Sequence, residues 1–491
     1  AMIWFLTLLL GCGPASDDPP AEAPTSTTPT EATSPTGTLS TASTASTGDT
    51  EGTESTGPTG STGVTDTGPF ATASPYVQRT GPPPKNVLVL TIDTTRYDRL
   101  NSNGYTGGTT SPHIDALLAS GLALRNHRSC SAWTMASFLC FLTGQDQVSL
   151  GTWPDNNNHG AGVDPYEGEL PSLAVRLKEQ GFATGLVYAN SFLSSKYNMN
   201  QGHDTEKKGG KAPSIRTEAL SRLDELVAED RWLLHVHFND PHSPYDPAEV
   251  HRLPGTDCPI HEVETGDGLD EFIDLYDAAP PADQQACLDH LWALYDAQIR
   301  EADAAIGDIL DALDAHGETA ETLIVFGTDH GEEFYEHGEW EHGHGLFQGL
   351  NRSTAGFVYP SRVAPAEHHG LTTHEDVLPT LLTVLDLPLS GDETGQPVGA
   401  APVDVVHGLV YRNRKTVQSV TTDTHALIHH WEGRTFLYDL VNDPDQTTNL
   451  IFSPKHGATA ADLWTLLRPR IDDLASKVTD GSVPEGLPTS P

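Results

Sequence analysis

The sequence has few basic residues, few cysteines and no apolar run long enough to cross a membrane. Its 491 residues include 27 lysines and arginines against 68 aspartates and glutamates, which gives a formal net charge of −41. Without a basic stretch the chain cannot neutralise the phosphates of a nucleic acid, so a nucleic-acid partner is excluded. An acidic chain of this kind fits a saline habitat or a need for solubility.

The five cysteines exclude a structural zinc site. Cys130, Cys140, Cys258 and Cys287 follow Cys12, and no pair of them has the spacing of a zinc finger. An exported domain permits disulfides. We expect Cys258 to pair with Cys287, because both flank one polar insertion.

The apolar run at residues 1–12 is far shorter than the roughly 20 residues that span a bilayer, and it is typical of a secretory signal. It ends in Leu9-Leu10-Gly11-Cys12, which resembles a bacterial lipoprotein cleavage box with Cys12 lipidated. We therefore expect an exported, cell-envelope lipoprotein of the outer membrane or cell surface, held to the membrane by its lipid anchor only. A buried apolar terminus is the alternative.

Residues 13–80 are almost entirely Ser, Thr, Pro, Gly, Ala and acids. Such a segment cannot bury enough apolar surface to offset the entropy of ordering it, so we expect a disordered tether. It carries eight acids and one base, which leaves −34 on the remaining residues. The folded part is therefore strongly acidic as well.

From residue 85 onward, apolar strands alternate with helices. We expect strands at 86–92, 183–188, 232–238 and 322–327, and helices at 111–122, 171–180 and 291–316. This order predicts a doubly wound α/β domain at 85–402, with its functional residues at the carboxyl ends of the strands. The segment 403–491 reads as a small antiparallel subdomain with strands at 416–422, 426–431 and 435–440 and a closing helix at 460–478.

Acidic and imidazole side chains follow two of the predicted strands. Asp93 comes directly after the first strand, and Asp329-His330 come just after the fourth. Because these strand ends meet at one edge of the sheet, the three side chains predict a metal site with open coordination positions. The alternatives are a turn-forming Asp93 and a loop salt bridge at Asp329-His330.

Several segments occur in the same order as the motifs of one known family. They include Thr91-Ile-Asp93-Thr-Thr-Arg96, Ser111-Pro-His-Ile-Asp115, Trp133-Thr-Met-Ala-Ser-Phe, Phe238-Asn-Asp-Pro-His242, Tyr295-Asp296 and Phe436-Leu-Tyr-Asp. On these residues the chain from 85 to its end resembles the sulfatase-like family of the alkaline-phosphatase superfamily. The resemblance implies a mixed, mostly parallel sheet flanked by helices with a small C-terminal antiparallel subdomain, and a hydrolase of sulfuric or phosphoric esters.

By this resemblance the nucleophile position is Thr134. Sulfatases that use formylglycine carry Cys or Ser there, with Pro and Arg where this chain has Ala136 and Phe138, so conversion to formylglycine is not supported. Cys130 and Cys140 are out of register with that position. Threonine serves as nucleophile in relatives that act on phosphodiesters or transfer phospho-groups. We expect the Thr134 hydroxyl to bind the metal together with Asp93, Asp329 and His330, because a metal-bound hydroxyl loses its proton more readily. Alternatively, Thr134 only caps the helix that follows.

The resemblance also assigns histidines to the substrate. His242 and either His342 or His344 are expected to act as general acid or as donors to the oxyanion, and to compensate for the missing arginine. Calcium-dependent sulfatases carry Asp-Asn where this chain has Asp-His at 329–330, and a second Asp where it has Thr94. Both differences favour one manganese or zinc ion over calcium.

Four other histidines are expected to be satisfied or exposed and without a catalytic role: His127, His235, His237 and His374. The leading hypothesis is metal-assisted hydrolysis of a sulfate or phosphate ester, either small or carried on a glycan or lipid. An envelope phospho-group transferase and a catalytically inactive ester-binding surface protein remain as alternatives.

Overall fold

The structure is a computed structural model that describes residues 74–152, 156–157, 162–163, 165–252, 257–260, 269–412 and 415–477. The expected signal at 1–12 and most of the expected tether at 13–80 lie outside the described residues. None of the helices within the described ranges is long and apolar enough to cross a membrane.

The last residues of the expected tether pack against the folded domain. Ser74 is buried and its hydroxyl donates to the carbonyl of Val398 at 2.6 Å. Val77 forms an isolated bridge with Val363. The prediction of disorder up to residue 80 is therefore wrong for residues 74–80, because these few polar and apolar side chains find partners more than 280 residues away in the chain.

The central sheet has eight strands in the order β12-β2-β11-β8-β1-β7-β5-β6. Among these strands β11 is the one that runs antiparallel to its neighbours. The bounds are β1 (Asn86–Ile92), β2 (Leu122–Arg128), β5 (Ala183–Tyr188), β6 (Thr205–Lys208), β7 (Trp232–Phe238), β8 (Thr322–Thr328), β11 (Arg352–Val358) and β12 (Ala366–Thr373). The predicted mixed, mostly parallel sheet is confirmed.

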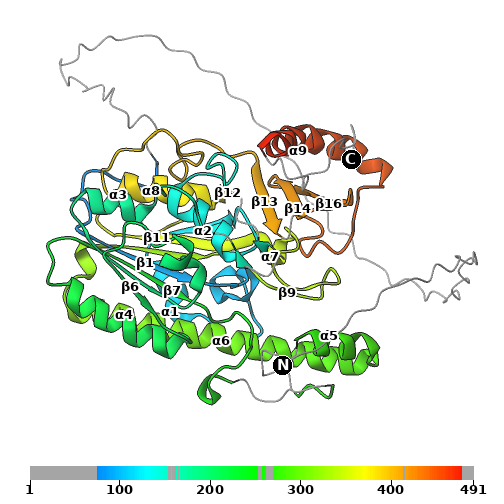
Figure 1. The fold of residues 1–491 in the computed structure, drawn as a ribbon, viewed down its shortest axis with the longest axis horizontal. Coiled ribbons are helices and arrows are strands. Elements are labelled where there is room, and N and C mark those ends of the chain that lie inside the picture. Colours follow the sequence, from blue (N-terminus) through cyan, green and yellow to red (C-terminus); the bar gives the residue numbers. More distant parts are fainter. Residues whose placement is uncertain are drawn as a thin grey trace, which may run out of the picture. The chain divides into compact units, whose positions relative to one another are not determined.

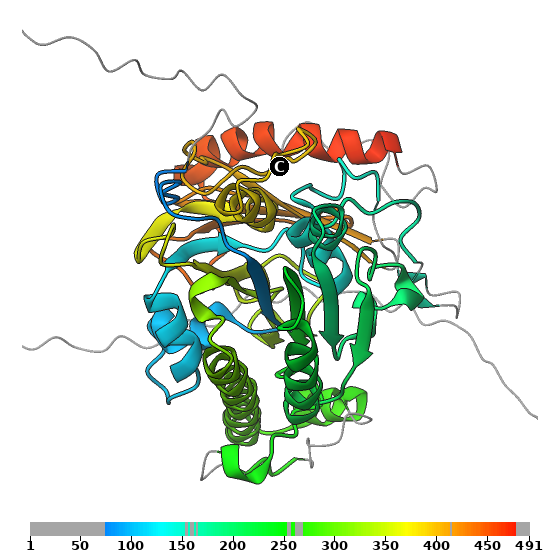
Figure 2. The ribbon, with the colours of Figure 1, turned by 90° about the vertical axis from the view of Figure 1, so that its left-hand side faces the viewer.

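Helices cover both faces of this sheet (Figure 1). Along β1, Val87 and Val89 face one core while Leu88, Leu90 and Ile92 face the other, as the alternation of side chains in a strand requires. The first core is covered by α2 (Thr134–Thr143), α3 (Leu173–Glu179) and α8 (Val377–Val384). The second is covered by α1 (Pro112–Ala119), α4 (Ala212–Leu226) and α6 (Pro281–Ala315), of which α4 and α6 lie side by side (Figure 2).

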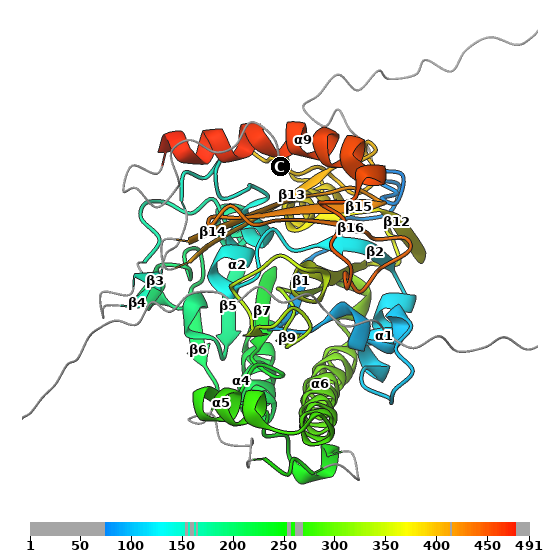
Figure 3. The same ribbon diagram turned by 90° about the vertical axis from the view of Figure 1, so that its right-hand side faces the viewer.

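The C-terminal segment forms a second, antiparallel sheet in the order β13-β14-β15-β16. Its strands are β13 (Val406–Arg412), β14 (Lys415–Thr421), β15 (His425–His430) and β16 (Thr435–Asp439). One face packs on α9 (Gly457–Lys477) through Leu427, Leu437 and Trp464, and Figure 3 shows α9 lying across the sheet. The other face contributes Ile428 and Tyr438 to the main core. The predicted small antiparallel subdomain is confirmed.

The described residues form six further strands and α-helices. They are β3 (Asn156–Asn157), β4 (Gly162–Val163), β9 (Glu333–Phe334), β10 (Trp340–Glu341), α5 (Leu269–Ala278) and α7 (Gln348–Asn351). The helix predicted at 111–122 is shorter than expected, because it ends at Ala119 and β2 begins at Leu122. The helix predicted at 291–316 begins earlier, at Pro281, with a proline in its first turn.

Candidate active site

The ends of β1 and β8 place two carboxylates side by side. The backbone N–H of Asp93 donates to the carbonyl of Phe238 at 2.9 Å, and that of Asp329 donates to the carbonyl of Ile92 at 3.2 Å. Both hydrogen bonds extend the parallel ladder by one step beyond the strands. Asp93 and Asp329 therefore lie at the carboxyl edge of the sheet, where open α/β sheets bind their ligands.

The turn after Asp93 is strained and serves the second carboxylate. Thr94 has a φ of 45°, an unusual backbone conformation for a β-branched residue. In this conformation the N–H of Thr94 donates to Asp329 Oδ1 at 3.0 Å, while the Tyr295 hydroxyl donates to the Thr94 carbonyl at 2.6 Å. The strain thus fixes the orientation of Asp329.

Asp93, Asp329 and His330 have the geometry expected of metal ligands. His330 Nε2 lies 3.6 Å from Asp93 Oδ1 and 3.5 Å from Asp329 Oδ2, and all three side chains are buried. His330 Nδ1 donates to the Gly331 carbonyl at 2.9 Å, so the neutral ring presents a lone pair at Nε2.

The atoms that face one another in this cluster lack hydrogen-bond partners: Asp93 Oδ1, Asp329 Oδ2 and His330 Nε2. Buried polar atoms are rarely left unpaired, and two carboxylate oxygens with an imidazole nitrogen are ligands for a divalent ion. Burial and the charge of Asp93 also raise the pKa of Asp329 well above its usual value, because two buried carboxylates repel each other. The cluster therefore fits a divalent metal.

Thr134 is the first residue of α2 and not its cap. The N-cap is Trp133, and Thr134 is buried. Its Oγ1 accepts a hydrogen bond from Asn190 Nδ2 at 3.0 Å, and the same amide donates to Asp93 Oδ2 at 2.7 Å. The structure thus places the expected nucleophile beside a residue of the metal-type cluster, at the positive end of a helix.

Asn190 is a site residue that we did not predict from the sequence. It lies two residues beyond β5, and its Oδ1 accepts the N–H of Phe192 at 3.0 Å. This contact orients the amide so that its donor group faces Thr134 and Asp93. The rule that pointed to Asp93, a polar side chain just past a buried strand, would have identified Asn190 too.

Phe138 stands where the resemblance expects an arginine, and it is fully buried. Its ring packs edge-on against His237 with ring centroids 4.9 Å apart. His237 Nδ1 is 3.0 Å from Thr91 Oγ1, and its Nε2 is 3.4 Å from Asp93 Oδ2. The sequence assigned His237 no role in the site, yet it lies against the carboxylate of Asp93. Phe138 and His237 therefore support Asp93, and the contact to the nucleophile comes from Asn190.

The structure distinguishes His342 from His344, between which the sequence could not choose. The ring of His342 lies 4.5 Å from that of His330 and 5.0 Å from that of His242, measured between centroids. His342 Nδ1 is also 2.8 Å from Glu332 Oε1. His344 instead pairs with Glu333 at 2.8 Å. Of the two, His342 therefore borders the metal-type cluster, as does His242.

The three other histidines without an assigned role are buried and hydrogen-bonded, as expected of structural residues. His235 contacts the Thr91 hydroxyl, and His127 contacts the Thr372 hydroxyl, each at 3.0 Å. His374 Nε2 is 3.2 Å from the Thr328 carbonyl.

Charges around His242 favour its protonated form. Burial alone would lower the pKa of this imidazole, but the carboxylates of Asp93 and Glu332 outweigh it and the pKa is raised. Its Nδ1 donates to the Ser243 carbonyl at 2.7 Å. In its protonated form His242 carries a proton on Nε2 that it can donate.

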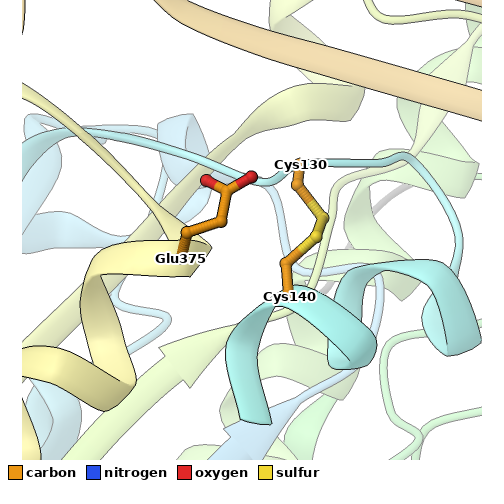
Figure 4. Close-up of side chains that lie close together, drawn as sticks. All are labelled: Cys130, Cys140 and Glu375. Atoms are coloured by element: carbon orange, nitrogen blue, oxygen red, sulfur yellow. A yellow bond between two sulfur atoms is a disulfide. The ribbon is translucent and has the colours of Figure 1, made fainter. Parts of the chain in front are cut away.

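A disulfide connects the turn before α2 to the helix itself. Cys130 and Cys140 are bonded, and Figure 4 shows Glu375 beside them. These three residues lie close enough together to resemble a second metal site. Sulfurs joined in a disulfide do not offer thiolates to a metal, so this group is structural. The expected Cys258–Cys287 disulfide is also present and is confirmed.

Comparison with known proteins gives a consistent result. The sequence model of the family described as Sulfatase matches residues 85–387. The choline-sulfatase of Rhizobium meliloti is 26% identical over 293 residues, which cover 54% of this chain and 55% of that enzyme, so the chain spans about half of this relative's length.

Two solved structures share the fold. A protein in complex with its substrate D-glucosamine-2-N,6-O-disulfate superposes with a TM-score of 0.66 and 18% identity, over 82% of this chain and 100% of that chain. The phosphonate monoester hydrolase of Agrobacterium radiobacter superposes with a TM-score of 0.56 and 18% identity, over 80% and 96% of the two chains.

Proposed function

Because this chain belongs to the sulfatase family, we propose that it hydrolyses sulfate or phosphate esters with Thr134 as the nucleophile. The observation that carries the proposal is the hydrogen-bonded sequence Thr134–Asn190–Asp93 beside Asp329 and His330. It joins a hydroxyl at a helix start to a buried cluster that fits a metal. An inactive binding protein has no need of this arrangement.

In this proposal Asp93, Asp329 and His330 hold one divalent ion. When bound, the ion lowers the pKa of a nearby hydroxyl and screens the negative charge of the ester. Manganese or zinc matches this site better than calcium, because His330 supplies an imidazole and Thr94 supplies no carboxylate.

Thr134 and the histidines carry the two steps. The Thr134 hydroxyl loses its proton to solvent, Oγ1 attacks sulfur or phosphorus, the bond to the ester oxygen breaks, and His242 gives its proton to the departing oxygen. Water, losing a proton to His242, then attacks the threonine ester and breaks its bond to Oγ1. Sulfate, phosphate or, from a diester, a phosphate monoester is released, and Oγ1 takes a proton from solvent to restore the hydroxyl. His342 lies where it can donate to the anion, and Asn190 donates to Oγ1 as negative charge develops there.

The nucleophile favours phosphodiester or phosphonate-type esters. With Ala136 and Phe138 after Thr134, the chain lacks the residues that accompany formylglycine, and the shared fold includes a phosphonate monoester hydrolase. Sulfate esters remain within the proposal because the family model and the choline-sulfatase support them. The lipoprotein-like start and the tether suggest that the substrate is met outside the cell.

An ester panel tests the proposal. The chain is stripped of metal, reloaded with manganese, zinc or calcium, and assayed on aryl sulfate, aryl phosphate and aryl phosphodiester. We expect turnover that depends on manganese or zinc and falls at least about a thousand-fold in Thr134→Ala. Turnover that survives in Thr134→Ala contradicts the assigned nucleophile. A chain that binds metal tightly but turns over none of the esters contradicts the enzymatic function.

A further inference from the structure

The carboxyl group of Glu332 connects the two loops that carry His242 and His342. Glu332 lies in the loop after β8, and its side chain is fully buried. Its Oε1 is 2.8 Å from His342 Nδ1, and its Oε2 accepts a hydrogen bond from the Tyr245 hydroxyl at 3.2 Å. Tyr245 follows His242 by three residues, so the partner that holds His342 is itself held by the loop of His242.

The backbone of Glu332 is fixed as well. The guanidinium of Arg96, which is buried, donates to the Glu332 carbonyl at 2.9 Å. A second side-chain hydrogen bond joins the same two loops, because the Ser243 hydroxyl donates to Glu341 Oε1 at 3.0 Å. Glu332 therefore has little freedom to move, and a ring that is bound to its carboxyl group is held with respect to the sheet.

The contact at Nδ1 restricts the ring of His342. An imidazole that is hydrogen-bonded through one nitrogen can rotate little, and only its other nitrogen remains for a further partner. The His342 ring lies close to those of His330 and His242, with centroids 4.5 and 5.0 Å away. The contact with Glu332 therefore leaves His342 Nε2 to meet an anion at the metal-type cluster.

The neighbouring glutamate shows that this role is specific to Glu332. A carboxyl group loses its hydration when it is buried, so each buried carboxyl needs hydrogen bonds that replace the water. Glu333 is also buried, but its oxygens lie 3.1 Å from His337 Nδ1 and 2.8 Å from His344 Nε2. Two adjacent buried glutamates thus bind different histidines, and Glu332 is the one that binds a histidine beside the metal-type cluster.

We propose that Glu332 is a positioning residue, which holds the ring of His342 so that its Nε2 contacts the anionic group of the ester. The hydroxyl of Tyr245 supports this role by orienting the Glu332 carboxyl group. The inference rests on the proposed function, in which His342 donates to the anion. Glu332 touches neither the ester nor the metal, and it acts only through His342.

Calorimetric binding of inorganic phosphate to the full chain loaded with manganese tests the proposal. This probe is a tetrahedral anion of the kind that the proposed reaction releases. We expect Glu332→Leu and His342→Ala each to weaken phosphate binding by about ten-fold. The two changes together should weaken it no further than His342→Ala alone, because the residue through which Glu332 acts is then absent.

A conservative variant and a matched control accompany this cycle. Glu332→Gln, whose amide can hydrogen-bond to both His342 and Tyr245, should bind phosphate within about three-fold of the unaltered chain. Glu333→Leu removes an equally buried carboxyl group from the same loop. Whatever its own effect on phosphate binding, it should add in full to that of His342→Ala, since Glu333 has no contact with His342 through which to act.

Tyr245→Phe makes the same test with a smaller change, because it removes one hydrogen bond and keeps the ring. It should weaken phosphate binding by about three-fold, and cause no further loss when His342→Ala is present. Circular dichroism establishes that each variant is folded. If Glu332→Leu does not fold, Tyr245→Phe with His342→Ala completes the cycle.

Losses that add in the combined variants overturn the proposal, because Glu332 would then act independently of His342. Unchanged affinity in His342→Ala or in Glu332→Leu also overturns it, as does a Glu332→Gln chain that binds as weakly as Glu332→Leu. An unaltered chain that binds no phosphate contradicts it as well. Binding of the anion does not require turnover, so the ester panel can fail while this proposal stands, and the reverse.

Discussion

At the residue scale, Asn190 orients the Thr134 hydroxyl. Its amide donates to Thr134 Oγ1 and to Asp93 Oδ2, and its own oxygen is occupied by the N–H of Phe192. A donor at this position stabilises the negative charge that Oγ1 carries when its proton is lost and again when the threonine ester is broken. Phe138, at the position of the family's arginine, cannot do so because its side chain has no hydrogen-bond donor, and its ring packs against His237.

Replacing Asn190 by Asp keeps the shape of the side chain but removes the donor and adds a carboxylate beside Asp93. We expect kcat to fall about a hundred-fold, a loss typical of removing one donor to a developing oxyanion, with a much smaller change in KM. Steady-state kinetics of Asn190→Asp at saturating metal measure both values. Asn442→Asp, an exposed position, is the matched control. A change confined to KM would show that Asn190 serves binding rather than catalysis.

Glu375 predicts a pH dependence of stability outside the active site. Burial, with the nearby charges of Asp146 and Asp376, raises the pKa of its carboxyl from 4.5 to about 7. Because the folded state holds this proton more tightly than the unfolded state, the buried charge destabilises the fold as pH rises above 4.5 and most fully above 7.

Glu375→Gln should therefore have a larger free energy of unfolding than the unaltered chain at pH 8, by about 3 kcal/mol at most. This difference should shrink toward pH 5. Urea unfolding at the two pH values measures it. Glu229→Gln, at an exposed position, should show no such trend. A stabilisation that is the same at both pH values would mean that the carboxyl of Glu375 is not the cause.

At the scale of elements, a disulfide constrains α2, the helix that begins with Thr134. The Cys130–Cys140 disulfide bridges the turn before the helix to its second turn, and every residue of α2 is buried. The disulfide therefore limits how far Thr134 can move relative to the strand ends that carry Asp93 and Asp329.

Cys130→Ser with Cys140→Ser should lower the free energy of unfolding by about 3 kcal/mol and also lower kcat, since α2 loses its constraint. The paired change Cys258→Ser with Cys287→Ser should lower stability by a similar amount while aryl-ester turnover stays unchanged. Chemical denaturation and steady-state assays distinguish the two. Equal loss of kcat in both pairs would contradict a specific role for the first disulfide.

The elements differ in how well the sequence predicts them, for physical reasons. β1, β5 and β7 begin and end where expected, because each is a short and largely apolar run. β2 was missed because Arg125, Asn126 and Arg128 break its apolar pattern. β12 was missed because it lies at the sheet edge with polar residues exposed.

The same reasoning applies to the candidate site. Asp93, Asp329 and His330 could be found because each follows a recognisable strand. The choice between His342 and His344 needs the path of a loop with several glycines, and no periodic pattern encodes that path. The role of His237 depends on its contact with Asp93, which lies 144 residues earlier in the chain.

At the scale of the whole molecule, the net charge of −41 makes self-repulsion a cost of compactness. Salt screens charges over about 8 Å at physiological ionic strength, so we expect the melting temperature to rise as sodium chloride increases from low to physiological concentration. Differential scanning calorimetry measures it at fixed metal. A melting temperature that falls over this range would mean that surface ion pairs contribute more than the repulsion.

The most direct measurement asks whether Thr134 carries the transferred group during turnover. The chain with His242→Ala, which lacks the proposed acid and base, is mixed with the preferred aryl ester, quenched with acid and mapped by peptide mass spectrometry. We predict one sulfuryl or phosphoryl group on the peptide that contains Thr134, absent when Thr134→Ala is added. Turnover of the same ester by the unaltered chain, with no modified Thr134 in either protein, would contradict a threonine nucleophile.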